Sequence, residues 1–437
     1  MNKVLWMLAL IGPVLGFSLY GQTNWEAYLE SHAEPWPKEN PTAEWGPRWA
    51  EHRFVLLGES THGTSEFYEM RATLTRHLME NGSHRFVVVE GDWEGLKKAN
   101  AYVRGESEYA SAEEVLLKLD RWPRWMWANR EFATLLEWMR EANQNRPEEK
   151  WFGVYGMDIY SWPGSFDALR DWLKDNDPNY LSTFDRQMRA LVRYRDNWPR
   201  YSHAAWAMAT RGPETVPTAM AGLKDRIRAA ELSKREETYF LIRARSVIAA
   251  ERHLREARLN NAESWNARAR HMKRTVEQLS ELLPEELGII VWAHNTHIGD
   301  ARATPMGEHG MVNIGSLMRE KKGTENVFLL GQTTGSGTFL GARTWEGERE
   351  IFAHKPPHRH SLEGHLATSF EEPMVIPFAE ALERGDELPV IGHRAIGVVY
   401  QVDAPQQHYV PSQLPQRYDT LLFFPETTAL HPLHERE

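Results

Sequence analysis

The feature that most constrains the fold of this chain is a set of short apolar runs that do not alternate in polarity. Runs of this kind, rich in valine, isoleucine, leucine and phenylalanine, are typical of strands that are covered on both faces, as in a parallel sheet. The sequence therefore predicts at least five buried strands. They are FVLLG (54–58), RFVVVEGDW (85–93), WFGVYGMDI (151–159), GIIVWAHN (288–295) and NVFLLGQTT (326–334).

Segments with helical periodicity lie between these runs. SEFYEMRATLTRHLMENG (65–82) has apolar residues at three- and four-residue spacing and ends at Asn81–Gly82, and REFATLLEWMREANQN (130–145) is similar. A strand, a helix and a second strand in this order favour an α/β unit with right-handed crossovers. We therefore expect an α/β fold, with a three-layer α/β/α core around a mostly parallel sheet.

The strand pattern is interrupted once. From about 165 to 285 the chain has long charged segments with helical periodicity, which we interpret as a large helical insertion. After residue 345 come a loop, AHKPPHRH, and the short strand-like segments RAIGVVYQ and DTLLFFP, which predict a small C-terminal α/β lobe. The expected division is a core in two parts (22–164 and 286–345), the insertion (165–285) and the lobe (346–437).

The N-terminus has the layout of a secretory signal peptide. Lys3 precedes an apolar run from Val4 to Leu19, and the small and polar pair Gly21–Gln22 follows. We expect residues 1–21 to be a signal peptide and the protein to be exported, to the periplasm. An uncleaved anchor and a buried N-terminal helix are the alternatives. No other stretch reaches the roughly 18 apolar residues of a membrane span, so no stable membrane insertion is expected after cleavage.

Composition narrows the chemistry. The chain has no cysteine, which excludes disulfides, thiolate metal sites and a cysteine nucleophile. Its net charge of −10 argues against nucleic acid as a partner. Eighteen tryptophans either fill a large core or line a cleft for a bulky, partly apolar small molecule.

Carboxylates and imidazoles lie at or just after the ends of four of the predicted strands. The carboxyl ends of parallel strands meet at one edge of a sheet, where ligands bind, so these side chains are expected to become neighbours. The residues are Glu59 and His62 after the first strand, Glu90 and Asp92 in the second, Asp158 in the third, and His294, Asn295 and His297 after the fourth.

The turn GESTHGTS (58–65) carries the clearest chemical signal. Gly58 and Gly63 would let the backbone bend, and Thr64 or Ser65 could cap the helix that follows. Capping alone does not explain Glu59 beside His62. A carboxylate next to a histidine fixes the imidazole tautomer and makes the ring a better base toward water.

Other chemistries fit this turn less well. A serine nucleophile elbow needs glycine where His62 stands. The spacings Glu59-x-x-His62 and His294-x-x-His297 occur among metal ligands, so a divalent metal stays possible, although no cofactor is required. Arg71 either forms a surface ion pair, or stabilises an oxyanion, or holds Glu59 or Glu90.

Several motifs together resemble the erythromycin esterase family. They are GESTHGTSEFYEMR, VVVEGDW, RWPRWMWANREF, VYGMDIYSW, NARARHM, VWAHNTHIGDARATPMGEHGMVNIGSLMREKKG, GSGTFLGARTWEG and YDTLLFFPETTALHPL, and they extend from about residue 45 to 433. The resemblance implies an α/β/α core with a helical insertion. It also implies a hydrolase that opens a macrolide lactone with activated water and forms no covalent enzyme intermediate.

The resemblance also implies roles for individual residues. His62 matches the general base and Glu59 its carboxylate partner. Arg71 and His294 match the arginine and second histidine of the site, and would stabilise the oxyanion. Glu90 is placed with the catalytic residues. The tryptophan-rich stretch around Trp125 and Trp127 would line the substrate cleft, and His297 and Asp92 are placed with the substrate-binding residues.

Two rival functions fit the same sequence. An esterase of this family could act on a different bulky ester and leave macrolides intact. A haem- or metal-binding protein without hydrolytic activity could use the same core, with histidines as ligands.

Overall fold

The computed structural model describes residues 19–37, 41–208, 215–379, 381 and 388–434. The expected signal peptide, 1–21, lies outside these ranges except for its last three residues, where helix α1 (Leu19–His32) begins. No helix in the described ranges is both long enough and apolar enough to span a membrane.

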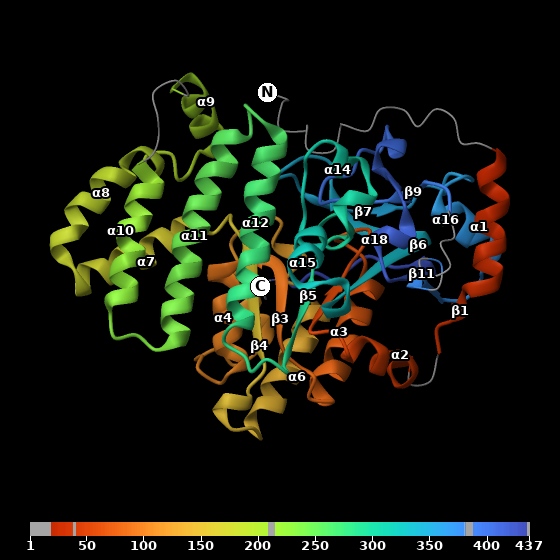
Figure 1. The fold of residues 1–437 in the computed structure, drawn as a ribbon, viewed down its shortest axis with the longest axis horizontal. Helices are drawn as coiled ribbons and strands as arrows, with labels where there is room; N and C mark the ends of the chain where they lie inside the picture. Colours follow the sequence, from red (N-terminus) through yellow and green to blue (C-terminus); the bar gives the residue numbers. More distant parts are fainter. Residues whose placement is uncertain (1–18, 38–40, 209–214, 380, 382–387, 435–437) are drawn as a thin grey trace. The chain divides into compact units, whose positions relative to one another are not determined.

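The fold is mixed α/β with a large, mostly parallel sheet, as the apolar runs predict (Figure 1). The described strands of this sheet follow the order β1-β8-β11-β6-β2-β5-β3-β4, and β7 pairs with β6. Neighbouring pairs from β11 to β3 run parallel, whereas β8, β1 and β7 pair antiparallel. The bounds are β1 Glu34–Pro35, β2 Phe54–Leu57, β3 His84–Asp92, β4 Gly153–Asp158, β5 Gly288–Trp292, β6 Val327–Ala342, β7 Arg349–Ala353, β8 Met374–Pro377 and β11 Thr420–Thr427.

Burial on both faces explains why the central strands read as unbroken apolar runs. Every residue of β2 and of β5 is buried, and Phe54 pairs with Ile289 on one side and with Val327 on the other. A polar side chain in such a strand would be buried without water on either face, which costs free energy unless it finds a partner.

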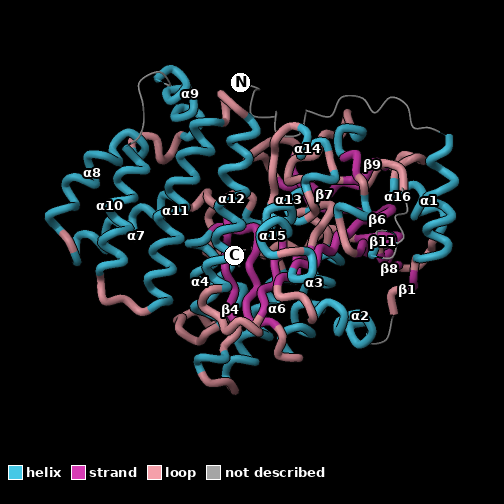
Figure 2. Tube along the Cα trace, in the orientation of Figure 1, coloured by secondary structure: helices cyan, strands magenta, loops and turns pink. Residues whose placement is uncertain are grey.

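Helices make up most of the remaining structure (Figure 2). The predicted helices at 65–82 and 130–145 are α3 (Ser65–Glu80) and α6 (Arg130–Gln144). The others are α2 Pro41–Ala50, α4 Trp93–Val103, α5 Ala112–Leu116, α7 Trp162–Asn176, α8 Pro178–Val192, α9 Trp198–Met208, α10 Thr215–Ala229, α11 Lys234–Glu256, α12 Asn261–Ser280, α13 Asn295–Ile298, α14 Pro305–Glu308, α15 Ile314–Lys322, α16 Leu362–Ser369 and α18 Leu414–Arg417.

The chain forms two compact units. Among the described residues, unit 1 comprises those within 19–89, 99–154 and 286–434, and unit 2 those within 90–98 and 155–285. Unit 2 therefore contains the helical segment expected at 165–285, together with residues 155–164 and 90–98. Unit 2 has its own apolar core, because α7, α8, α10 and α11 direct residues such as Phe166 and Leu223 toward one another.

The C-terminal residues do not form the separate lobe that we expected. DTLLFFP is β11, and it pairs with β6 and β8 inside the large sheet. RAIGVVYQ is not a regular strand. Only its first residue, Arg394, belongs to a regular strand: β9 (Ile391–Arg394) ends there and pairs with β10 (Tyr409–Ser412). A short apolar run can be buried in a regular strand or in an irregular segment. For residues 394–401 the local sequence pattern does not distinguish these two structures.

Candidate functional site

The turn after β2 carries Glu59 and His62 into a tightly packed region. Neither Gly58 nor Gly63 has a positive φ, so bending is not what requires glycine here. A Cβ on Gly58 would overlap the Asn295 side-chain oxygen, and one on Gly63 would overlap the Leu340 carbonyl. These glycines are required because neighbouring segments approach the turn closely.

The hydroxyl groups of the turn do not act as simple helix caps. Thr64 is the N-cap residue of α3, yet its side chain makes no capping hydrogen bond and instead pairs with the Thr61 hydroxyl. Ser65 donates to the Glu131 carboxylate at 2.6 Å. The turn is therefore held by side-chain contacts with one another and with α6.

Glu59 lies at the centre of a buried ion-pair group. Its Oε1 is 2.8 Å from His62 Nδ1, and its Oε2 accepts a hydrogen bond from Arg71 Nη2 at 2.6 Å. Because the carboxylate accepts from Nδ1–H, the neutral ring keeps its lone pair on Nε2. The His62 side chain retains 9% of its exposure, whereas that of Glu59 retains 1%. Water can therefore reach the imidazole but not the carboxylate behind it.

Arg71 is fully buried, and its guanidinium lies over two aromatic rings. The guanidinium carbon is 4.2 Å from the Tyr68 ring centroid and 4.8 Å from that of Trp292. Of the alternatives for Arg71, the structure shows the one in which it holds Glu59. Placed this deep, the guanidinium orients the carboxylate and is not positioned to contact an oxyanion on a substrate.

His294 joins this group from the end of β5. Its ring centroid is 4.9 Å from that of His62, so the structure brings together two imidazoles that lie far apart in the sequence. Its Nδ1 accepts from the Thr296 backbone N–H at 3.3 Å, and its Nε2 lies 3.3 Å from the Ser60 carbonyl. The hydrogen on Nε2 would have to leave that carbonyl before it could reach a developing oxyanion.

Glu90 and Asp92 belong to unit 2, where Arg268 pairs with Glu90 and Asp158. Arg268, on α12, donates to Glu90 at 2.7 Å and to both oxygens of Asp158 at 2.8 Å. Burial alone would lower the pKa of Arg268, but Asp158 and Glu90 raise it well above its usual value. Asp92 accepts from the Ser161 backbone N–H at 3.1 Å.

The residues predicted to contact substrate are all buried. Trp125 and Trp127 are 4% and 6% exposed, and Trp127 packs against Tyr68 and Phe132. His297 lies in the short helix α13 and is 4% exposed. Trp127 therefore packs on the Tyr68 ring that contacts Arg71, and a role for the two tryptophans in substrate binding stays a prediction.

Metal-ligating side chains do not gather at one point in the described part of the chain. No three histidine or acidic residues there are grouped so that they could hold a metal ion. His62 contacts the Glu59 carboxylate, and His294 contacts the Ser60 carbonyl and the Thr296 backbone N–H.

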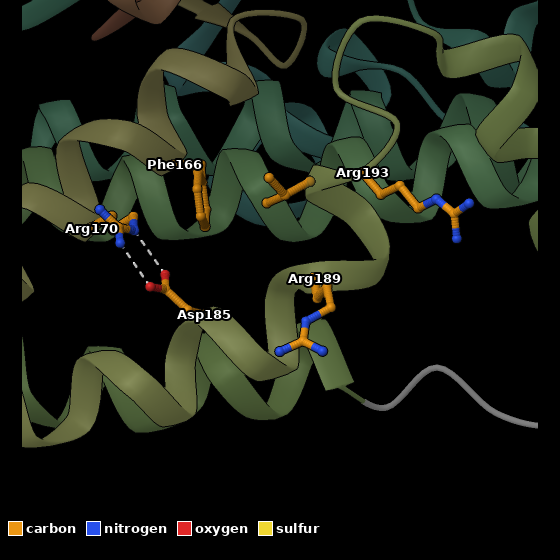
Figure 3. A pocket seen from close by; sticks show the side chains of 6 residues that line it. Phe166, Arg170, Asp185, Arg189 and Arg193 are labelled. Carbon is orange, nitrogen blue, oxygen red and sulfur yellow. Dashed lines mark hydrogen bonds and ion pairs between the residues drawn. The ribbon is translucent and has the colours of Figure 1, made fainter.

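A cavity of about 390 Å³ lies in unit 2 and contains none of the predicted site residues. Figure 3 shows its lining of apolar and arginine side chains from α7 and α8, where Arg170 pairs with Asp185. A second cavity of about 270 Å³ lies in unit 1 beside Glu131 and His431. Neither cavity includes His62.

Sequence reasoning missed two groups of buried polar residues. Arg268 lies in the motif NARARHM, and an arginine amid a helical charged segment reads as solvated surface. Glu363 and His393 form a second acid–imidazole pair at 2.9 Å, with both side chains at 0% exposure. Glu363 lies on α16 and His393 on β9, and neither residue follows one of the predicted strands. Their contact is therefore visible only in the tertiary structure, where α16 packs against β9.

The fold and the Glu59–His62 group define a mixed α/β protein with a buried carboxylate–imidazole site. The family model described as erythromycin esterase matches residues 79–427, and the chain belongs to that family. Membership of this family supports the classification of the protein as a hydrolase. The match begins after Glu59, His62 and Arg71, so their assignment rests on the motif and the geometry.

Individual relatives are distant. The chain is 21% identical over 383 residues to the Bacillus subtilis (strain 168) protein named "Putative hydrolase YbfO", covering 81% of each. A solved succinoglycan biosynthesis protein shares 19% identity with a TM-score of 0.73, covering 95% of this chain and 100% of that one. A histidine variant of the erythromycin esterase EreC, in its open conformation, shares 15% with a TM-score of 0.61, covering 89% and 94%.

Proposed function

We propose that this protein hydrolyses the lactone ester of macrolides, with His62 as the general base that activates water. The observation that carries the proposal is the His62 Nδ1 to Glu59 Oε1 contact of 2.8 Å on a ring that keeps some exposure. Family membership and the likeness in fold to EreC support the choice of reaction and substrate.

In the proposed reaction His62 acts first as a base and then as an acid. His62 Nε2 takes a proton from water, and the resulting hydroxide adds to the ester carbonyl. The tetrahedral intermediate then expels the alkoxide, which receives the proton from His62. The products are a carboxylic acid and an alcohol in one opened ring, and no bond to the enzyme forms.

The other groups prepare this step. Glu59 stabilises the imidazolium that forms, and Arg71 holds the Glu59 carboxylate in its orientation through the 2.6 Å hydrogen bond to Oε2. His294 lies beside His62, and its Nε2–H could turn from the Ser60 carbonyl to the oxyanion. Removing a single oxyanion donor typically slows hydrolysis about 10²- to 10³-fold.

Mass spectrometry of a macrolide panel tests the reaction. Incubation with the protein should add the mass of one water to at least one lactone, and the product should be the ring-opened acid. Parallel samples with a chelator test metal dependence, and a water-activated reaction at His62 should proceed in both. If no macrolide gains water while other bulky esters do, the substrate assignment is wrong and the esterase chemistry stands.

Replacement of His62 tests the assignment of the base. His62→Ala should lower kcat about 10²- to 10⁴-fold, because it removes the proton acceptor. His358→Ala is the matched control, since His358 is an exposed histidine in the loop before α16 and should leave kcat unchanged. Near-full turnover by purified His62→Ala would remove this residue from the mechanism.

We further propose that the protein is exported to the periplasm. The basic, apolar and small-residue order of residues 1–22 is typical of a signal peptide. The mass of the protein from fractionated cells tests this: periplasmic material should lack about the first 21 residues. Full-length protein confined to the cytosolic fraction would contradict export.

A further inference from the structure

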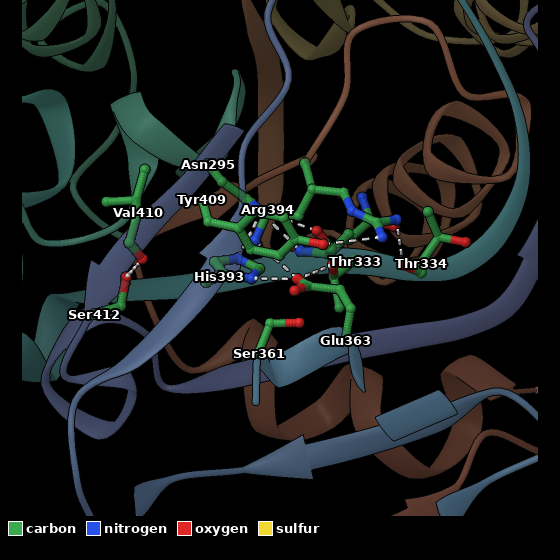
Figure 4. Close-up of polar contacts among 12 residues, drawn as sticks. Asn295, Thr333, Thr334, Ser361, Glu363, His393, Arg394, Tyr409, Val410 and Ser412 are labelled. Atoms are coloured by element: carbon green, nitrogen blue, oxygen red, sulfur yellow. Dashed lines mark hydrogen bonds and ion pairs between the residues drawn. The ribbon is translucent and has the colours of Figure 1, made fainter. Parts of the chain in front are cut away.

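A second acid–imidazole pair contacts the side chain of Asn295, whose backbone N–H contacts Glu59. Glu363 Oε1, on α16, accepts three hydrogen bonds: from His393 Nδ1 at 2.9 Å, from the Thr333 hydroxyl at 2.7 Å and from the Arg394 backbone N–H at 3.0 Å (Figure 4). Glu363 and His393 are both completely buried, so neither can contact a substrate.

The protonation state of the pair is determined by its surroundings. Burial acts to raise the pKa of Glu363, but the bond from His393 and the charge of Arg394 lower it to about 2. Burial lowers the pKa of His393. The carboxylate is therefore ionised and the imidazole neutral at pH 7, with its hydrogen on Nδ1 and its lone pair on Nε2.

That lone pair is directed at Asn295. Asn295 Nδ2 lies 3.2 Å from His393 Nε2 and donates its other hydrogen to the Gln332 carbonyl at 2.8 Å. Both amide hydrogens thus have acceptors, and only one orientation of the amide satisfies them. The Asn295 oxygen then faces Gly58, the glycine that precedes Glu59 and that has no Cβ to collide with it.

Asn295 also contacts the candidate site through its backbone. Its N–H donates to the Glu59 carbonyl at 2.8 Å, and its chain neighbour is His294. A continuous set of hydrogen bonds therefore leads from Glu363 through His393 and Asn295 to the residue that orients His62.

We propose that Glu363 and His393 are positioning residues, which act through Asn295 to hold Glu59 and His294 in register with His62. This proposal rests on the proposed hydrolase function for its kinetic test. The structural part, that His393 restrains the junction of Glu59 and Asn295, can be tested without any substrate.

Two isosteric variants separate the two ends of the His393 ring. The side-chain amide of Asn can occupy the place of Nδ1, and that of Gln the place of Nε2. His393→Gln therefore keeps a partner for Asn295, whereas His393→Asn keeps one for Glu363 only. We expect His393→Asn to lower kcat roughly 10-fold, with KM within about twofold, because a buried donor loses its acceptor. His393→Gln should recover most of that loss.

A double variant tests whether His393 acts through Asn295. If it does, His393→Asn combined with Asn295→Ala should be no slower than Asn295→Ala alone. Additive losses in kcat would overturn the proposal. Asn295→Ala also provides the kinetic test if His393→Asn does not fold, because it should show the same fall in kcat at unchanged KM.

Hydrogen exchange of the full chain provides the readout that is independent of substrate. In His393→Asn the amides of peptides covering 293–299 should exchange faster, while those of β2 and β5 keep their protection. Equal loss of protection in all three segments would mean that His393 only stabilises the fold. Unchanged exchange at 293–299 would also overturn the proposal. If exchange responds locally but no ester is turned over, the proposed function fails and the positioning contact stands.

His408→Gln is the matched control. His408 is 3% exposed, lies in the same C-terminal part of the chain, and accepts from the Gln401 backbone N–H at 3.0 Å. It makes no hydrogen bond to Asn295 in the described structure. Its replacement should leave exchange at 293–299 and kcat unchanged, and a response equal to that of His393→Asn would overturn the specific role of His393.

Discussion

At the scale of single residues, the candidate site depends on charges that have been removed from water. Glu59 and Arg71 are both completely buried, and each is acceptable in the interior because of the other. A charge without its partner at such a depth is strongly unfavourable. The aromatic rings of Tyr68 and Trp292 give the guanidinium further favourable contacts without taking up its hydrogen-bond donors.

We therefore expect Arg71→Met to lower the free energy of unfolding by about 3–5 kcal/mol, because it leaves the Glu59 carboxylate buried without a counterion. Glu59→Gln combined with Arg71→Met should recover part of this loss. Chemical denaturation measures both. Arg76→Met, on the same helix but with a single bond to the Thr134 carbonyl, should cost under about 1 kcal/mol. An equal loss in the two arginine variants would contradict the argument.

At the scale of elements, helix α12 carries one charged and one neutral ionisable side chain on the same buried face. Arg268 is held in its charged form by Glu90 and Asp158, whereas His271, three residues further along, is held neutral. Burial and the charge of Arg245 lower the pKa of His271 to about 3. Residues at this spacing face the same side of a helix, so the neighbourhood of each group decides its charge.

This difference predicts a pH dependence of stability. The usual pKa of histidine is 6.5, and that of His271 in the folded chain is about 3. Between these two pH values the unfolded chain binds a proton at His271 that the folded chain does not. Stability should therefore fall with falling pH by about 1.4 kcal/mol per pH unit for this group. His271→Gln should reduce the slope of unfolding free energy against pH by that amount. Equal slopes for the two proteins would show that His271 is not held neutral.

At the scale of the whole molecule, the C-terminal segment is part of the main sheet. β11 lies between β8 and β6, and its residues Leu421 to Phe423 are buried. A chain truncated after residue 345 would leave the apolar edge of β6 unpaired and uncovered. We expect the truncated chain to lack a cooperative thermal transition and to aggregate, as measured by circular dichroism and light scattering. A soluble fragment with a sharp transition would show that 346–437 is a separate lobe.

The local pattern was sufficient for the elements whose environment is uniform along their length. The apolar runs predict β2, β3, β4, β5 and the first part of β6, because burial on both faces removes polar residues from a strand. The continuation of β6 to Ala342 is partly exposed and is not predicted by the run at 326–334. α3 and α6 were predicted because one apolar face gives a regular spacing. The apolar runs do not predict β9 or the place of the C-terminal segment in the sheet. A run of apolar residues shows that a segment is buried, but it does not show which neighbouring segments it packs against.

For the site, the sequence by itself determined which turn carries the acid and the base, because Glu59 and His62 are three residues apart after a buried strand. Only the tertiary structure decided that Arg71 holds Glu59, that the His62 and His294 rings meet, and that Glu363 and His393 reach Asn295. The physical reason is that a hydrogen bond or ion pair depends on distances in space between residues that may be hundreds of positions apart, and no short stretch of sequence records such a distance.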